Sequence, residues 1–276
     1  MDDRTELSGF LKSRRARLRL QDVGLRDYGA VRRVAGLRRE ELARIAGVSI
    51  AHYTRLEQGD SDSVSAEVLD AVGTALRLDA DELSYLHHLA RRPRPCAAIP
   101  SSLEVPAGYR HLLESFAMTP ALVIGRHTQI IGWNPLAVAV FGDFPARPEN
   151  RRTLSHLLFA DAYVRELLGA DWEDAAREQV GHLRFLMGRY RADAALSAHV
   201  DHMRSLSQDF ARMWAEFPVR KIRSGSYTLH HPTVGDMTLH RELIALPDEP
   251  TCCGLDLFAA EPGSESELAL RSLARS

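Results

Sequence analysis

A short stretch of the chain carries side chains that suit contact with the edges of DNA bases. Within "ARIAGVSIAHYTRLEQG" (43–59), the side chains that we expect to face outward are Ser49, Ile50, Ala51, His52, Thr54 and Arg55. Small and apolar groups can touch a thymine methyl, a threonine hydroxyl can donate or accept, and an arginine can reach guanine or a phosphate. A helix face that meets water normally carries several charges. A face with one arginine among small neighbours therefore favours close approach to base edges.

Arginines around this stretch could contact DNA phosphates. Arg38 and Arg39 open the first helix of the motif, where free backbone amides also favour anions. Arg32 and Arg33 fall in the loop before it, where they could follow the DNA backbone or enter a minor groove. The alternative for this pair is a solvated loop. Residues 10–60 hold 12 Arg and Lys against 6 Asp and Glu, a net of +6, whereas residues 96–276 hold 18 against 22, a net of −4. That division suggests a segment that binds a polyanion, joined to a different domain.

Two short helices must position these side chains. The pattern predicts helices over 37–46 and 49–58, on either side of Gly47, which accepts a positive φ at a tight turn. Ser49 can cap the second helix and Gly59 can end it. The residues expected to pack inward are Leu42, Ala46, Tyr53 and Leu56. This is a helix-turn-helix, whose second helix enters the major groove. The alternative is a plain helical hairpin with Ile50 packed against another domain.

Three more helices and a linker complete the first part of the chain. An amphipathic helix is expected over 4–19, with one face apolar (Leu7, Phe10, Leu11 and Leu18) and the other basic (Lys12, Arg15 and Arg19). A glycine-containing loop follows over 20–36. Helices are then expected over 65–77 and 80–91, and Asp79 with Glu82 fits a capping box. Three prolines in "RRPRPCAAIP" (91–100) mark a linker. We therefore predict an all-α domain over 1–92, a linker over 93–107, a second domain over 108–263 and a loose or helical tail over 264–276.

The second domain has a mixed pattern. "ALVIGRHTQIIGW" (121–133) suggests a β-hairpin, and Asn134 before Pro135 looks like a capped helix start. Residues 153–217 are mostly helical in pattern, and residues 221–260 supply three strands. The order of strands, helices and strands predicts an α+β domain, with helices over one face of a sheet.

Two parts of the chain carry a family resemblance. The run "LRREELARIAGVSIAHYTRLEQG" resembles the helix-turn-helix of lambda-repressor/XRE-type regulators, and its "GLRREELA" and "YTRLEQG" pieces are similar to the MmyB-like bacterial transcription regulators. The later stretches "TPALVIGRHTQIIGWNPLAVAVFGDF" and "HHPTVGDMTL" resemble the C-terminal domain of that family. The resemblance implies a five-helix DNA-binding domain followed by a PAS-like ligand domain, which in this family has been associated with fatty acids or other apolar small molecules. The chain departs from the family's pattern at Phe217–Val219, at Tyr227 and at Arg241.

An apolar ligand needs a mostly apolar cavity. Large apolar and aromatic residues recur among the middle helices and the strands, and the resemblance raises the expectation that some line a pocket: Phe116, Trp133, Phe141, Phe185, Met187, Tyr190, Met203, Met213, Trp214 and Leu239. An ordinary hydrophobic core is the alternative for each of them.

Metal and catalytic signals are weak. His199 with His202 could chelate an ion, but neither this pair nor His230, His231 and His240 stands at a recognised zinc spacing, so we expect structural or surface histidines and no metal. The chain has no phosphate-binding loop and no nucleophile elbow, so we expect no enzyme. Three cysteines, two of them adjacent, suit a reducing cytosol. An acidic start without an apolar run indicates no signal peptide, and no stretch approaches the length of a membrane span.

These observations predict a one-component transcriptional regulator in the cytoplasm. Its first domain binds operator DNA, as a homodimer on an inverted repeat, and its second domain senses a small apolar ligand. No other cofactor is expected. Two alternatives remain, a DNA-binding domain fused to an enzyme and one fused to a protein-interaction module.

Overall fold

The computed structural model describes residues 3–24, 36–60, 64–91, 104–245 and 252–275. The chain divides into two compact units. Unit 1 contains Met1–Cys96, Arg184–Ala198 and Met213–Lys221, and unit 2 contains Ala97–Leu183, His199–Arg212 and Ile222–Ser276. This division differs from the linear one predicted from the sequence, because two later segments pack with the N-terminal helices. Most of the predicted linker, with Arg32 and Arg33 of the predicted loop, lies outside the described residues.

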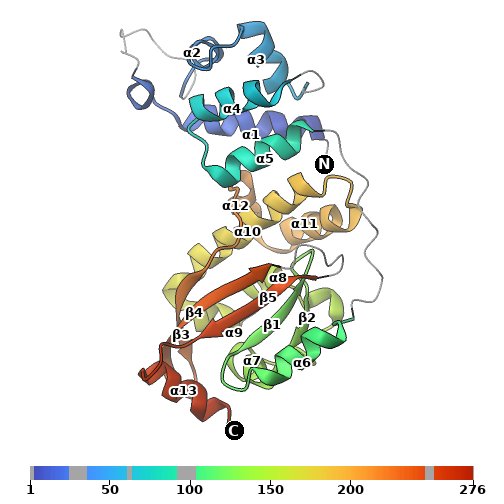
Figure 1. Ribbon diagram of the computed structural model, residues 1–276, viewed down its shortest axis with the longest axis vertical. Coiled ribbons are helices and arrows are strands. Elements are labelled where there is room, and N and C mark those ends of the chain that lie inside the picture. Colours follow the sequence, from blue (N-terminus) through green and yellow to red (C-terminus); the bar gives the residue numbers. More distant parts are fainter. Residues whose placement is uncertain (1–2, 25–35, 61–63, 92–103, 246–251, 276) are drawn as a thin grey trace. The chain divides into compact units, whose positions relative to one another are not determined.

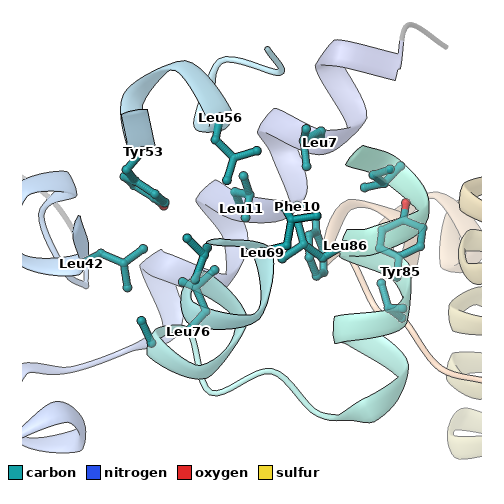
Figure 2. Packing of buried hydrophobic residues seen from close by; sticks show 14 of the residues in the cluster. Leu7, Phe10, Leu11, Leu42, Tyr53, Leu56, Leu69, Leu76, Tyr85 and Leu86 are labelled. Carbon is teal, nitrogen blue, oxygen red and sulfur yellow. The ribbon is translucent and has the colours of Figure 1, made fainter. Parts of the chain in front are cut away.

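Five α-helices form the N-terminal part of unit 1 among the described residues, as expected (Figure 1): α1 (Asp3–Arg17), α2 (Arg39–Ile45), α3 (Ile50–Glu57), α4 (Ala66–Ala75) and α5 (Ala80–Ala90). A short 3-10 helix (Leu20–Val23) begins the predicted loop. Figure 2 shows how the helices meet around Phe10 and Leu11 of α1, with Leu42, Tyr53 and Leu86 reaching the same core. The inward face predicted for α1 is confirmed, since Leu7, Phe10, Leu11 and Leu18 are all buried.

The turn between α2 and α3 follows the prediction. Gly47 has a φ of 67°, in the region that favours glycine. Ser49 is the N-cap of α3, and its hydroxyl accepts a hydrogen bond from the backbone of His52 at 3.1 Å. Leu42 and Tyr53 are fully buried, so α2 and α3 form the expected helix-turn-helix.

Two segments from later in the chain complete the core of unit 1. Phe185 and Val219 are buried in the same hydrophobic cluster as α1 and α5. Phe217 has a φ of 54°, and its ring lies so close to Gly9 that an added Cβ there would stand 2.5 Å from it. Arg14 donates to the carbonyl of Phe217 at 2.7 Å. These residues therefore belong to the body that carries the helix-turn-helix.

Unit 2 is built on a five-stranded antiparallel sheet (Figure 1). The strands are β1 (Ala121–Gly125), β2 (Ile130–Trp133), β3 (Gly225–His231), β4 (Gly235–Ala245) and β5 (Cys252–Ala259), in the spatial order β2-β1-β5-β4-β3. The predicted hairpin is β1 with β2, and the three predicted strands are β3 to β5. The α+β fold class is therefore confirmed.

Helices accompany the sheet on both faces. The remaining helices are α6 (Ala107–Ser115), α7 (Pro135–Phe141), α8 (Leu154–Ala160), α9 (Ala162–Leu168), α10 (Trp172–Arg189), α11 (Ala194–Leu206), α12 (Gln208–Ala215) and α13 (Glu265–Leu273). The expectation of helices over one face is wrong. Side chains alternate between the two faces along a strand, and here the side chains of both faces pack against helices. Val123 and Leu255 point to the face packed by Leu113 of α6, whereas Leu122 points to the opposite face, where α8 and α9 contribute side chains.

The cap of α7 agrees with the prediction, and the predicted tail contains a regular helix. Asn134 caps α7 with Pro135 at the first helical position, as expected. The predicted tail contains a regular helix, α13, which is capped by Ser264 and buries Leu270 and Leu273. It contacts β4 and α7 and is therefore part of unit 2. No helix among the described residues is long and apolar enough to cross a membrane.

Candidate nucleic-acid interface and ligand cavity

The outer face of α3 carries the side chains predicted to meet DNA. Ile50 is 55 % exposed although it is a large apolar residue, and Ala51 and Arg55 are also exposed. His52 and Thr54 are half-buried. Ser49 is exposed and uses its hydroxyl for the cap. The structure thus gathers the six predicted residues at one end and along one side of a short helix.

The two described phosphate candidates lie at the start of α2. Arg38 is its N-cap residue and is half-buried. Arg39 is the first helical residue, and 43 % of its side chain is exposed. Its Nε donates to Oε1 of Glu57 at 2.6 Å, so a carboxylate of α3 already holds this arginine. The outer guanidinium nitrogens of Arg39 are the part left to reach a phosphate.

Glu57 is a buried carboxylate that the sequence analysis did not single out. Its side chain is fully buried. Arg15 donates to both of its oxygens, at 2.7 and 3.1 Å, and the Tyr53 hydroxyl donates at 2.8 Å. Burial raises the pKa of Glu57, but the hydrogen bonds from Arg15, Arg39 and Tyr53 outweigh it and leave the pKa below its ordinary value. The i, i+4 spacing of Tyr53 and Glu57 was the available signal.

The same network corrects the prediction for Arg15. It was assigned to the solvent face of the first helix, yet only 12 % of its side chain is exposed. Besides Glu57, it donates to the carbonyl of Leu37 at 2.6 Å. Arg15 therefore ties α1 to the helix-turn-helix instead of facing water.

Unit 2 contains a small apolar cavity. Its volume is about 80 Å³, and it lies between the sheet and helices α7 to α10. Eleven of its lining residues are apolar: Leu122, Phe141, Leu154, Leu157, Leu158, Val164, Leu167, Leu168, Ala175, Leu229 and Phe258. Four carry polar groups: Gln179, Tyr227, Arg241 and Asp256. This combination is typical of a site for a small molecule that is mostly hydrocarbon.

The polar residues of the lining are paired with one another or with neighbours. Arg241 donates to both oxygens of Asp256, at 2.7 and 2.5 Å, and the Asp256 side chain is fully buried. Burial lowers the pKa of Arg241, but the adjacent Asp256 outweighs it and leaves the pKa above its ordinary value. Tyr227 donates to Glu178 at 3.1 Å, and Gln179 donates to Thr128 and Ser155.

Comparison with known proteins assigns both parts of the chain. A helix-turn-helix domain family matches residues 6–86, and the family described as MmyB-like transcription regulator ligand binding domain matches residues 105–273. The chain belongs to the MmyB-like transcription regulators. No curated protein matches it significantly. As a member of that family, the protein is a DNA-binding transcription regulator with a ligand-binding domain, and the 80 Å³ cavity lies within the matched ligand-binding region.

Only one residue predicted to bind ligand in this MmyB-like regulator lines the cavity, namely Phe141. Five of the others belong to unit 1: Phe185, Met187, Tyr190, Met213 and Trp214. Phe116 packs on the opposite face of the sheet, and Trp133 packs against Phe144. Met203 and Leu239 are buried in unit 2 without lining the cavity. The other lining residues are mainly leucines of α8 and α9, whose sequence pattern does not distinguish them from ordinary core residues.

The histidines considered as metal ligands have different partners. His230 pairs with Asp236 at 2.7 Å, His240 lies 2.8 Å from the Ser226 hydroxyl, and His231 lies 3.0 Å from the carbonyl of Ala139. The rings of His199 and His202 lie 5.8 and 5.5 Å from the ring of His156. No group of side chains in the described parts of the chain meets the geometry of a metal site.

We expect His199 to make the stability of unit 2 depend on pH. Burial, with repulsion from His156, His127 and His202, lowers its pKa to about 4. An unfolded histidine titrates near pH 6.5, so the unfolded chain takes up the proton first as the pH falls. Stability should therefore drop between about pH 6.5 and 4, by about 3 kcal/mol from this group.

Urea unfolding at several pH values measures this loss. His199→Gln should flatten the dependence, because it removes the group whose pKa is lowered in the folded chain. Equal slopes for the parent and His199→Gln would contradict the assignment.

Proposed function

We propose that this regulator is a one-component switch, in which a small apolar ligand in unit 2 changes the affinity of the α3 face for an operator. The observation that supports sequence-specific binding to an operator is the exposed face of α3, where Ile50 is 55 % exposed next to Ala51 and Arg55. A helix of this kind reads the major groove when its side chains reach base edges. Binding as a homodimer to an inverted repeat would follow the usual geometry of helix-turn-helix proteins. Such a regulator would act in the cytoplasm, with the DNA.

The cavity supports an apolar ligand, such as the hydrocarbon chain of a fatty-acid-like molecule. Its volume of about 80 Å³ is smaller than the roughly 150 Å³ of an engineered apolar cavity that holds benzene. A longer chain must therefore push the lining leucines apart as it enters. A ligand that moves its lining in this way has different affinities for the two arrangements, which is the requirement for a switch.

Helix α10 offers a route for the effect. It contributes Ala175 and Gln179 to the cavity lining and Phe185 to the core of unit 1. A shift of α10 in response to a ligand would therefore disturb the packing that supports the helix-turn-helix. Footprinting of the DNA upstream of the protein's own gene, together with mass spectrometry of molecules released from the denatured protein, tests the operator and the ligand separately.

We expect Thr54→Ala and Arg55→Ala each to weaken operator binding by about 1–3 kcal/mol for every base that the truncated side chain no longer reaches. Both side chains lie on the outer side of α3 and neither belongs to the core, so the free energy of unfolding should hardly change. Titration of a labelled operator with each variant measures the weakening.

Arg204→Ala is the control, because it removes an exposed arginine from unit 2. Variants at Thr54 and Arg55 that bind the operator as tightly as the parent would remove α3 from its proposed place in the major groove.

A further inference from the structure

The charges that line the cavity are already neutralised. Arg241 is the one cation among the described lining residues, and Asp256 is the one anion. The guanidinium uses its Nε and Nη2 atoms on the two oxygens of Asp256, in the two-bond geometry that arginine and carboxylate prefer. Only 11 % of the Arg241 side chain and none of the Asp256 side chain is exposed.

The remaining edge of Arg241 faces a second carboxylate. Its Nη1 atom lies 3.7 Å from Oε2 of Glu178, and the same oxygen accepts the hydrogen bond of the Tyr227 hydroxyl. Glu178 is also well buried, with 11 % of its side chain exposed. Arg241 therefore has two carboxylates beside it, so its positive charge is already paired before any ligand enters.

A third carboxylate brought by a ligand would meet repulsion here. Charges interact more strongly in a poorly solvated interior than in water, and an ion that loses its water without gaining a partner is strongly disfavoured. An uncharged polar end loses far less on entering. It can still use Arg241, the Tyr227 hydroxyl or Asp256 as hydrogen-bond partners.

We propose that the ligand of this cavity is a hydrocarbon chain with an uncharged polar end, such as an alcohol, an amide or an ester, and that the Arg241–Asp256 pair discriminates against a carboxylate. The inference rests on the proposed ligand role of the cavity. It narrows the fatty-acid-like class to its neutral members.

Calorimetric titration of the parent protein with octan-1-ol and with octanoate at neutral pH tests the proposal directly. The two probes share a chain length and differ in the charge of the polar end, because a carboxyl group is ionised at this pH. Octan-1-ol should bind at least about tenfold more tightly. Ala175→Phe, which fills space in the lining, should abolish binding of both probes.

Releasing Arg241 should largely remove the preference for the alcohol. In Asp256→Asn the guanidinium loses its main counterion, so octanoate should gain at least about tenfold in affinity while octan-1-ol changes little. Asp236→Asn is the matched control, since it makes the same change at a carboxylate that is 72 % exposed. It should leave both affinities as in the parent.

The outcomes separate this proposal from the function on which it rests. Octanoate binding to the parent as tightly as octan-1-ol, with loss in Ala175→Phe, would overturn the discrimination and leave the cavity as a ligand site. Failure of both probes to bind, or binding that persists in Ala175→Phe, would overturn the ligand site and the discrimination together. The comparison of probes on the parent does not depend on whether Asp256→Asn folds.

Discussion

Replacing Glu57 with alanine is expected to lower the free energy of unfolding by about 3–5 kcal/mol, the usual loss when one partner of a buried ion pair is removed. The carboxylate is fully buried and accepts hydrogen bonds from Arg15, Arg39 and Tyr53. Without it, the mostly buried guanidinium of Arg15 and the hydroxyl of Tyr53 lose their shared acceptor. Because these groups come from α1, α2 and α3, the loss falls on the body that presents the DNA-binding face.

Urea unfolding followed by circular dichroism measures the effect. Glu149→Ala is the control, since this glutamate is 87 % exposed and pairs with Arg152 at 3.4 Å. An exposed pair of this kind contributes only about 0–1 kcal/mol. A similar loss for both variants would show that the buried network does not stabilise the helix-turn-helix.

Replacing Arg184 with methionine is expected to cost a comparable 3–5 kcal/mol, again roughly the loss for breaking a buried pair. Only 1 % of the Arg184 side chain is exposed, and it pairs with Glu6 of α1. It also donates to the carbonyl of Trp214 at 2.5 Å and lies over the Trp214 ring, 4.0 Å from its centre. The Tyr85 hydroxyl donates to the same Glu6 at 2.7 Å. Loss of the cation would leave the Glu6 carboxylate without its main partner in the core of unit 1.

A double variant separates the charge from the packing. Glu6→Gln combined with Arg184→Met removes the unpaired charge and keeps an acceptor for Tyr85, so it should be clearly more stable than Arg184→Met alone. Arg177→Ala, at an exposed i, i+4 pair on the same helix, should change stability by less than about 1 kcal/mol. Equal losses for the single and double variants would assign the effect to packing instead of charge.

Local patterns predicted the local structure well. Gly47 and Ser49 marked the turn and the cap of α3, and Asn134 with Pro135 marked the start of α7. Leu42 and Tyr53 were placed inward from their helical spacing, and both are fully buried. Turn chemistry, capping and periodicity act within a few residues, so each can be interpreted from a short window.

Partners that lie far apart in the chain could not be predicted in this way. Phe185 and Trp214 were predicted to line a ligand pocket, with an ordinary core as the alternative, and nothing in their spacing showed that Phe185 packs in the core built by α1 and α5 or that Trp214 lies beside Arg184 in unit 1. Arg15 was predicted to lie on the solvent-facing side of its helix, because its buried partner Glu57 lies 42 residues away in the sequence. The Arg241–Asp256 pair depends on the register of β4 and β5, which the strand pattern does not specify.

The most direct test of the proposed switch is titration of the operator with the parent protein, in the absence and in the presence of saturating octan-1-ol. If the cavity and the α3 face are coupled, the two binding curves should differ by about 5- to 150-fold in affinity, and by linkage the operator should change the affinity for octan-1-ol by the same factor. Ala175→Phe, whose cavity is filled, should give the same curve with and without the alcohol. Coinciding curves for a parent protein whose cavity is occupied by octan-1-ol would contradict the account.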